Sequence, residues 1–219
     1  MTDGLLVVDK PAGWTSHDVV AKLRGVCGQR RIGHAGTLDP DATGVLLVGL
    51  GRVTRLLRFL QETTKEYRGV VAFGVATDSL DAAGAVLERK AMPVGKDGVR
   101  RAMERFVGDI AQVPPMVSAL KVGGRRLHQL AREGKEVERE PRLVHIERFE
   151  LEDFEPGPYP RATVLVECSS GTYIRSLAAD LGALFSANEL DDAQFAGVAE
   201  AVTAELDDAG VAARAVAEA

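Results

Sequence analysis

Cysteine is scarce in this sequence, and long apolar runs are absent. The two cysteines, Cys27 and Cys168, lie far apart along the chain, which favours free thiols over a disulfide. No run approaches the roughly 18 apolar residues of a membrane span, and the first residues lack the charged and apolar regions of a signal peptide. These absences predict a cytoplasmic protein with no membrane partner.

Metal-binding and dinucleotide-binding patterns are lacking as well. The four histidines are scattered, with no H-x-x-x-H pair and no paired cysteines, so we expect no metal site. Residues 45–54 imitate a dinucleotide-binding fingerprint, but Thr54 stands where the third glycine or alanine is required. We therefore discount this fingerprint.

A net positive charge, typical of many nucleic-acid-binding proteins, is also missing. The total of −5 hides an uneven distribution, because residues 186–219 hold eight acidic side chains and one arginine, whereas residues 1–185 hold 26 basic and 24 acidic ones. Phosphate binding needs a local basic surface, so the total neither predicts nor excludes an RNA partner. We predict a folded domain over residues 1–185 and an acidic, alanine-rich, partly helical tail over residues 186–219.

Glycine is concentrated in residues 33–44, which read Gly-His-Ala-Gly-Thr-Leu-Asp-Pro-Asp-Ala-Thr-Gly and precede the apolar run of residues 45–48. A glycine-rich segment beside a buried strand marks tight turns or close approach of a ligand. Asp39 comes just before Pro40, which favours an extended backbone and holds the carboxylate on a stiff support. Asp39 is either an active-site carboxylate or the cap of a turn.

Apolar and β-branched patterns predict the main elements around this loop. The stretch 65–74 is typical of a central strand, and a helix begins near Ser16, which can act as its N-cap. Helical spacing predicts further helices in the segments 53–60, 98–106, 174–181 and 195–206, and alternation predicts strands at 149–154 and 162–168.

The segment 33–44 closely resembles the signature loop of the TruB family of tRNA pseudouridine synthases. The resemblance extends over about residues 4–184. It includes the Lys-Pro pair at Lys10, the Thr-Asp-Ser-Leu-Asp-Ala-Ala-Gly stretch at 77–84, the Pro-Pro-Met-Val-Ser-Ala-Leu-Lys stretch at 114–121 and the Ser-Ser-Gly-Thr-Tyr-Ile-Arg stretch at 169–175.

This resemblance implies an α+β protein of the pseudouridine synthase fold, with a mixed, mainly antiparallel central sheet flanked by helices and RNA-binding loops. It implies that the protein isomerises uridine 55 in the T-loop of tRNA to pseudouridine, after flipping the base out of its stack. The reaction exchanges no electrons or groups with a third molecule, so neither cofactor nor metal is expected. The implied partner is the T-arm of tRNA, and we expect a monomer.

The same resemblance assigns roles to residues. Asp39 matches the nucleophile, Tyr67 the tyrosine that stacks on the target base, and Arg175 the arginine that pairs with the catalytic carboxylate. His34 matches the histidine that occupies the space left by the base. The expected substrate-binding residues are His34, Gly36, Thr37, Lys10, Lys121, Arg125 and Arg126.

Each of these residues also has a plainer interpretation. A lysine before proline is typically a solvated turn residue, Tyr67 could be core packing, and Arg175 could point to solvent. The polar stretch 77–84 can satisfy its own backbone through Asx-turns. The alternating charges of residues 121–142 are typical of a wet surface, although in the family this hairpin and helix grip the tRNA arm.

The sequence departs from the family after Leu184, where relatives continue with Gly-x-x-Ala-His-Leu-x-x-Leu-Arg-Arg-Thr and this chain reads Phe185-Ser186. We interpret the junction as an internal deletion that removes one wall of the pocket. Two other functions stay open on this evidence. One is a non-catalytic tRNA-binding protein or RNA chaperone of the same fold, and the other is a hydrolase that uses Asp39 and Asp41.

Overall fold

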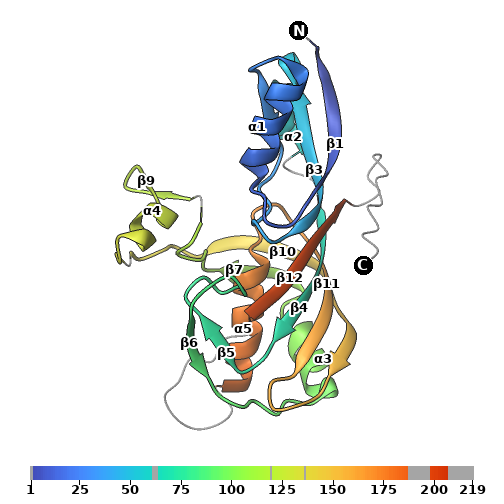
Figure 1. The fold of residues 1–219 in the computed structure, drawn as a ribbon. Helices are drawn as coiled ribbons and strands as arrows, with labels where there is room; N and C mark the ends of the chain where they lie inside the picture. Colours follow the sequence, from blue (N-terminus) through green and yellow to red (C-terminus); the bar gives the residue numbers. More distant parts are fainter. Residues whose placement is uncertain (1, 61–63, 119, 136, 187–197, 207–219) are drawn as a thin grey trace. The chain divides into compact units, whose positions relative to one another are not determined.

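The computed structural model describes residues 2–60, 64–118, 120–135, 137–186 and 198–206 (Figure 1). The chain divides into two compact units. The first unit comprises Met1–Arg68, Glu167–Ser170 and Ala201–Ala219, and the second comprises Gly69–Val166 and Gly171–Glu200. Three strands contain residues of both units, namely β4 (Lys65–Ala72), β11 (Arg161–Cys168) and β12 (Val198–Leu206).

The first unit is organised around strand β3 (Thr43–Leu50). Strand β1 (Gly4–Lys10) pairs with it antiparallel, and the register runs from Gly4 opposite Leu50 to Lys10 opposite Gly44. Strand β2 (Ile32–His34) is also antiparallel to β3. The other elements of this unit are α1 (Ser16–Cys27), the 3-10 helix η1 (Gly51–Arg55) and the single turn α2 (Leu57–Leu60).

Both faces of β3 are buried, which explains its unbroken apolar run. Leu46 and Val48 cluster with Val20 of α1, whereas Leu47 clusters with Leu57 of α2. A strand covered on both sides needs apolar residues at successive positions rather than at alternate ones. The strand predicted at residues 45–48 is therefore confirmed.

The helix predicted over residues 53–60 is wrong in part, because the segment is split into η1 and α2. Leu57 is buried, but Leu56 is 54% exposed. The burial of Leu57 depends on Gly49, where an added Cβ would lie 3.1 Å from the Leu57 side chain. Packing of the Leu57 side chain against Gly49 therefore fixes the backbone conformation of this segment.

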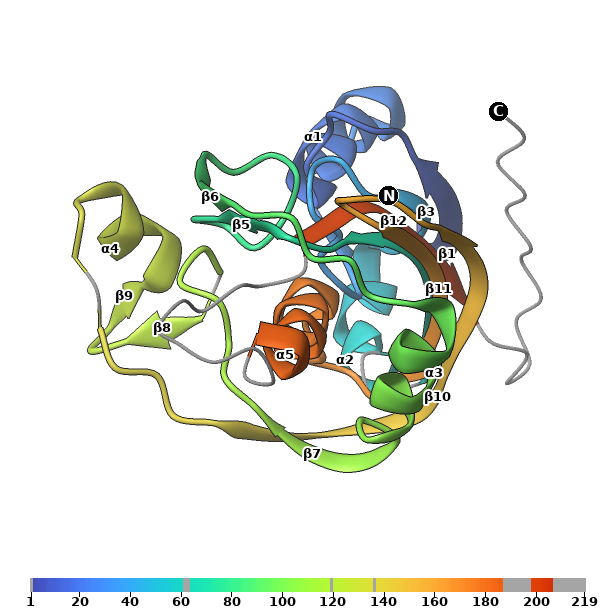
Figure 2. The same ribbon diagram turned by 90° about the horizontal axis from the view of Figure 1, so that it is seen from below.

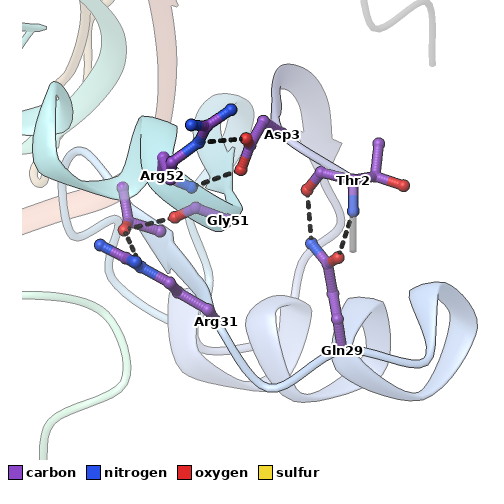
Figure 3. Close-up of polar contacts among 7 residues, drawn as sticks. Thr2, Asp3, Gln29, Arg31, Gly51 and Arg52 are labelled. Atoms are coloured by element: carbon purple, nitrogen blue, oxygen red, sulfur yellow. Dashed lines mark hydrogen bonds and ion pairs between the residues drawn. The ribbon is translucent and has the colours of Figure 1, made fainter.

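The residues just before β1 are hydrogen-bonded to η1 and to the loop that follows α1 (Figure 3). The Asp3 carboxylate accepts hydrogen bonds from the backbone N–H and the Nε of Arg52, both at 2.6 Å. Thr2 and Gln29 exchange two hydrogen bonds, of 2.8 and 3.0 Å. Gly51 has a φ of 58° and lies against Asp3, so a side chain there would be strained and would collide with that carboxylate.

The second unit is a largely antiparallel sheet with two helices and two hairpins. Strands β4, β11, β10 (Arg142–Glu155) and β7 (Gly108–Gln112) are neighbours in that order. The helices are α3 (Lys96–Glu104) and α5 (Ile174–Ser186). One hairpin is formed by β5 (Val75–Thr77) and β6 (Val86–Arg89), the other by β8 (Lys121–Val122) and β9 (Arg125–Arg126).

The β8–β9 hairpin continues directly into α4 (Leu127–Arg132), and we call residues 121–132 the arm. Both views place the arm apart from α3 and α5 (Figures 1 and 2). The hairpin register sets Lys121 opposite Arg126 and Val122 opposite Arg125, and all six residues from 121 to 126 are exposed. The prediction of a hairpin followed by a helix is confirmed.

The tail contradicts one prediction. Residues 198–206 form strand β12, which pairs in parallel with β3 at Thr203 and Ala204, and not the amphipathic helix expected there. Within this stretch the expected apolar positions, Val198, Val202 and Leu206, are four residues apart. This spacing fits one helix face and also one face of a strand, so neighbouring backbone decides between them. Residues 187–197 and 207–219 lie outside the described residues, and the division at residue 185 stays a prediction.

Helices and mainly antiparallel strands together confirm the α+β class. Within the described residues, no helix is both long enough and apolar enough to cross a membrane.

Candidate active site

A buried lysine supports the loop of residues 33–44, which we call the signature loop. Lys10 is 0% exposed, and its Nζ donates to the carbonyl oxygens of Trp14 at 2.6 Å, Pro40 at 2.9 Å and Pro11 at 3.0 Å. Interpreting Lys10 as a solvated turn residue is therefore wrong. A buried ammonium must find hydrogen-bond acceptors, and here the backbone just after Asp39 supplies one.

Burial lowers the pKa of Lys10, and the negative charges of Asp41 and Asp39 oppose that shift. The lysine thus contributes both charge and hydrogen bonds to the acidic part of the loop. Its predicted contact with substrate stays a prediction, and the three bonds give it a positioning role.

Ser16 holds the other side of the loop. Its hydroxyl accepts a hydrogen bond from the Leu38 backbone N–H at 3.0 Å, and Ser16 is buried. The N-cap of α1 is therefore not Ser16 but Thr15, which forms a capping box with Asp18. Thr15 and Ser16 could both cap the helix. The Ser16 hydroxyl is bonded to the signature loop instead, so Thr15 is the N-cap.

Backbone hydrogen bonds complete the support of the signature loop. Ala35 donates to the Leu47 carbonyl at 2.9 Å, Gly13 donates to the Pro40 carbonyl at 2.9 Å, and Ala42 closes a turn onto the Asp39 carbonyl at 3.1 Å. The Asp39 backbone is thus held on both sides, while Asp39 itself is exposed. Such support aims a carboxylate without enclosing it.

Tyr67 lies at the beginning of β4 and packs against Leu38 and Ala42, the apolar residues that flank the acidic part of the loop. Burial raises the pKa of Tyr67, and the neighbouring Cys168 and the Asp39 charge raise it further. The phenol therefore stays protonated at neutral pH. It can stack on a ring and donate a hydrogen bond, but it does not act there as an anion.

A pocket of about 450 Å³, open to solvent, lies between the signature loop and Tyr67. Two of the predicted substrate-binding residues, Gly36 and Thr37, line it. Its walls are Ala35, Gly36, Thr37, Leu38, Val45, Leu46, Leu47, Leu60, Lys65 and Tyr67.

The pocket contains one charged residue that the sequence analysis did not predict. Lys65 lines the pocket two residues before Tyr67, on the same strand. A lysine at the first position of a strand usually points to solvent. The one signal in the sequence was the i, i+2 spacing of Lys65 and Tyr67, which puts both side chains on one face of the strand.

His34 ends strand β2, where it pairs with Val48, and it is half-buried. Burial lowers its pKa, and an interaction with the backbone of Gly36 opposes this shift. The histidine is not among the residues that line the pocket. Its predicted contact with the RNA stays a prediction.

Arg175, in the second unit, is the first-turn arginine of α5. It is only 7% exposed, so the prediction of an inward-facing guanidinium is favoured over the solvent-exposed alternative. Its Nη1 lies 3.0 Å from Oδ2 of Asp81 and 3.4 Å from the carbonyl oxygen of Ser79. Asp81 belongs to the Thr-Asp-Ser-Leu-Asp stretch, whose role as an arginine partner the sequence analysis did not predict.

The polar stretch 77–84 also contains the expected local turns. Asp81 Oδ1 accepts a hydrogen bond from the Ala83 N–H at 3.2 Å, and Asp78 Oδ1 accepts one from the Ala85 N–H at 2.9 Å. The two interpretations of this stretch are therefore compatible, since Asp81 closes a turn with one oxygen and binds Arg175 with the other.

The start of α5 is fastened to the end of β7 by a buried glutamine. Gln112 donates to the Tyr173 carbonyl at 3.1 Å and accepts from the Tyr173 N–H at 2.8 Å. The Ser176 hydroxyl donates to the Val113 carbonyl at 3.1 Å. These bonds place Arg175 on rigid backbone, as a positioned guanidinium requires.

The arm carries the remaining predicted residues. Lys121, Arg125 and Arg126 are all exposed, and Arg125 forms a two-pronged ion pair with Glu133. Exposed ion pairs of this kind contribute little to stability. Asp39 and Arg175 belong to different units, so their predicted pairing stays a prediction.

The chain has the pseudouridine synthase fold. A chain in the crystal structure of a Cbf5-Nop10-Gar1 complex has 27% sequence identity and a TM-score of 0.67, over 92% of this chain and 47% of that chain. The family model described as "TruB family pseudouridylate synthase (N terminal domain)" matches residues 24–174. The chain belongs to the TruB family.

Curated relatives agree with this assignment. A protein of Symbiobacterium thermophilum named tRNA pseudouridine synthase B is 55% identical over 181 residues, which cover 82% of this chain and 60% of that protein. The Thermobifida fusca protein of the same name is 50% identical, over 84% of this chain and 64% of its own length. The chain thus spans somewhat less than two thirds of these relatives.

Proposed function

We propose that the protein is a tRNA pseudouridine synthase that isomerises uridine 55 in the T-loop. The observation that carries the proposal is the signature loop. Its acidic part is held by buried Lys10 and Ser16, it carries an exposed carboxylate at Asp39, and it borders a pocket shared with a protonated Tyr67. The names of the curated relatives support the same activity.

The reaction breaks the N1–C1′ bond of uridine, turns the uracil and joins its C5 to C1′. The C5 proton leaves, and N1 takes up a proton. In this proposal Asp39 is the nucleophile, which adds either to C1′ or to C6 of the ring. A free aspartate has a pKa near ~3.9, so Asp39 needs positioning more than activation. The supports of the signature loop provide that positioning.

Tyr67 stacks on the flipped uracil in this proposal. A stacked base must first leave the T-loop, at a free-energy cost of about a few kcal/mol. A half-buried aromatic ring beside an open pocket recovers part of that free energy by stacking. Because Tyr67 stays protonated, it receives the C5 proton only through a relay and not as a ready phenolate.

Arg175 pairs with the Asp39 carboxylate in the working enzyme, and Asp81 keeps the guanidinium oriented. A guanidinium carries five N–H donors, so it can in principle bind two carboxylates at the same time. Arg175 would then orient the Asp39 carboxylate and compensate its charge.

The arm binds the T-arm of tRNA through phosphate contacts from Lys121, Arg125 and Arg126. We propose that the protein acts on this substrate in the cytoplasm and as a monomer. Light scattering of the protein with and without tRNA tests the oligomeric state. Arginine and lysine on an exposed hairpin neutralise phosphates and release counterions, so binding depends on salt.

One experiment tests the activity. Unmodified tRNA transcript is incubated with the protein or with its Asp39→Asn variant, and pseudouridine is mapped by chemical labelling. Conversion at position 55 that is lost in the variant supports the proposal. Tight tRNA binding without any conversion indicates a non-catalytic RNA-binding protein, and an abasic site indicates a hydrolase. Either result overturns the proposal.

A further inference from the structure

Lys65 is a cation in the candidate pocket for which the mechanism above has no use. It lines the pocket together with Tyr67, and its Nζ lies over the signature loop, 3.3 Å from the position that a Cβ would take on Gly36. The absence of a side chain at Gly36 therefore makes room for the ammonium group.

No acidic side chain neutralises Lys65 within the part of the chain that the structure describes, and its Nζ makes no hydrogen bond there. The side chain is half-buried, and burial lowers its pKa, with Cys168 opposing the shift. The contrast with Lys10 is clear, because Lys10 satisfies its ammonium with three carbonyl oxygens. The Lys65 Nζ is not one of the fully buried polar atoms that lack a partner, so it borders the open pocket and can meet a ligand there. Because the charge has lost part of its hydration and has no acidic partner, it favours an anionic ligand.

The chemistry of the proposed function supplies such an anion. If Asp39 adds to C1′, the electron pair of the broken N1–C1′ bond stays with the uracil, and the negative charge spreads over N1, O2 and O4. That charge exists only between bond cleavage and the formation of the C5–C1′ bond. A preorganised cation in a poorly hydrated pocket stabilises such a transient charge better than water does.

We propose that Lys65 is a catalytic residue whose ammonium group binds the detached uracil anion, in the pocket where Tyr67 stacks on the ring. The lysine forms no covalent bond and transfers no proton. It remains an ammonium throughout, and its contribution is strongest when the base is free. This proposal rests on the proposed synthase function and adds a residue to it.

The test compares Lys65→Met and Lys65→Arg with the wild-type protein. Single-turnover pseudouridine formation at saturating enzyme gives the rate constant, and filter binding gives the Kd for tRNA. We expect Lys65→Met to lower the rate constant about 100-fold with the Kd within about threefold of wild type. Lys65→Arg keeps the charge and should recover to within about tenfold of wild type.

Lys22→Met is the matched control, because Lys22 is an exposed lysine of α1 in the same unit. It should leave both quantities unchanged. Thermal unfolding of all variants checks that none has lost the fold.

A pH profile adds a readout that a merely structural lysine would not change. The titratable groups that face Lys65 are Tyr67 on its own strand and Cys168 on β11. The wild-type rate should fall on the alkaline side with a midpoint below the ordinary lysine value of 10.5, and Lys65→Met should lack this limb. A Cys168→Ala variant should keep the limb, which excludes the thiol as its origin.

Two results would overturn the proposal while leaving the synthase function intact. One is a Lys65→Met protein as fast as wild type. The other is a loss of tRNA affinity that accounts for the whole change in rate, which would make Lys65 a phosphate contact. If the wild-type protein forms no pseudouridine at all, the proposed function itself fails, so the two failures are distinguishable.

Discussion

The signature loop and the arm are built in opposite ways, although the family resemblance assigns both to substrate recognition. The loop is held by groups buried beneath it, since Lys10 and Ser16 each bond to its backbone. The arm presents exposed side chains from 121 to 126, and Arg125 pairs with Glu133 next to its own helix.

This difference separates two physical requirements. A nucleophile must be placed within a fraction of an ångström, which needs buried and directional hydrogen bonds. Phosphate contacts tolerate looser geometry, because charge attraction falls off slowly with distance. Substitutions beneath the loop should therefore change rate and stability, whereas substitutions on the arm should change affinity.

Lys10→Met should have the largest effect. It removes a fully buried ammonium together with its hydrogen bonds to three carbonyl oxygens, of which only the Pro40 carbonyl keeps another donor, the Gly13 N–H. We expect a loss of about 3 kcal/mol in the free energy of unfolding, measured by urea denaturation. Pseudouridine formation should fall with it, even under conditions where the variant is folded. Stability equal to that of Lys22→Met would show that the buried bonds do not support the loop.

Asp81→Asn extends the comparison to the second unit. The neutral amide leaves the buried Arg175 guanidinium without its carboxylate partner at 3.0 Å. We expect about 2 kcal/mol of destabilisation and a roughly tenfold lower single-turnover rate, with tRNA affinity retained. Asp78→Asn serves as the control, because Asp78 bonds to backbone of the same loop. An equal effect of both substitutions would argue for a loop defect and against a specific role of the ion pair.

Tyr67→Phe tests the protonated state of the phenol. An unfolded tyrosine ionises near pH 10.0, whereas in the folded protein the pKa is raised. The stability contribution is therefore complete below pH 10 and is lost as pH rises, by up to about 1.4 kcal/mol per pH unit. Urea denaturation between pH 8 and pH 11 should show a shallower decline for the variant. Parallel curves for both proteins would contradict the buried environment of Tyr67.

Ser16→Ala removes a single support of the signature loop. The Leu38 N–H loses its acceptor at 3.0 Å in a buried site. We expect about 1 to 2 kcal/mol of destabilisation by thermal or urea unfolding, and a moderate loss of rate. Thr15→Ala, which removes the true N-cap, should cost about 1 kcal/mol but leave the rate nearly unchanged. Rate losses of the same size would mean that helix stability alone explains the result.

Lys121→Ala should have the smallest effect on the folded protein and a selective effect on RNA. Lys121 is exposed, so its removal should leave stability within about 0.5 kcal/mol. The Kd for tRNA should rise several-fold, and the slope of log K against log salt should drop by about 1. Titrations at several salt concentrations measure both. A reduced rate constant with unchanged affinity for tRNA would contradict the view that the arm contributes to affinity and the signature loop to rate.

Local patterns predicted much of the fold correctly. The apolar run at 45–48 and the helical spacing of Leu177, Ala178 and Leu181 were sufficient, because strong patterns belong to elements whose neighbours agree with them. The segments 53–60 and 198–206 were not predicted correctly. Their apolar spacing fits more than one structure, and contacts with β3 decide the outcome in both.

The sequence by itself determined the family, since the twelve residues from Gly33 to Gly44 form a long and specific motif. Only the tertiary structure decided how that motif is supported. In the folded chain Lys10 is buried, and the Ser16 hydroxyl accepts a hydrogen bond from the Leu38 N–H. Arg175 pairs with Asp81, which lies 94 residues away in sequence. The physical reason is that a motif reports which groups must be present, whereas burial and hydrogen bonding depend on which distant segments meet.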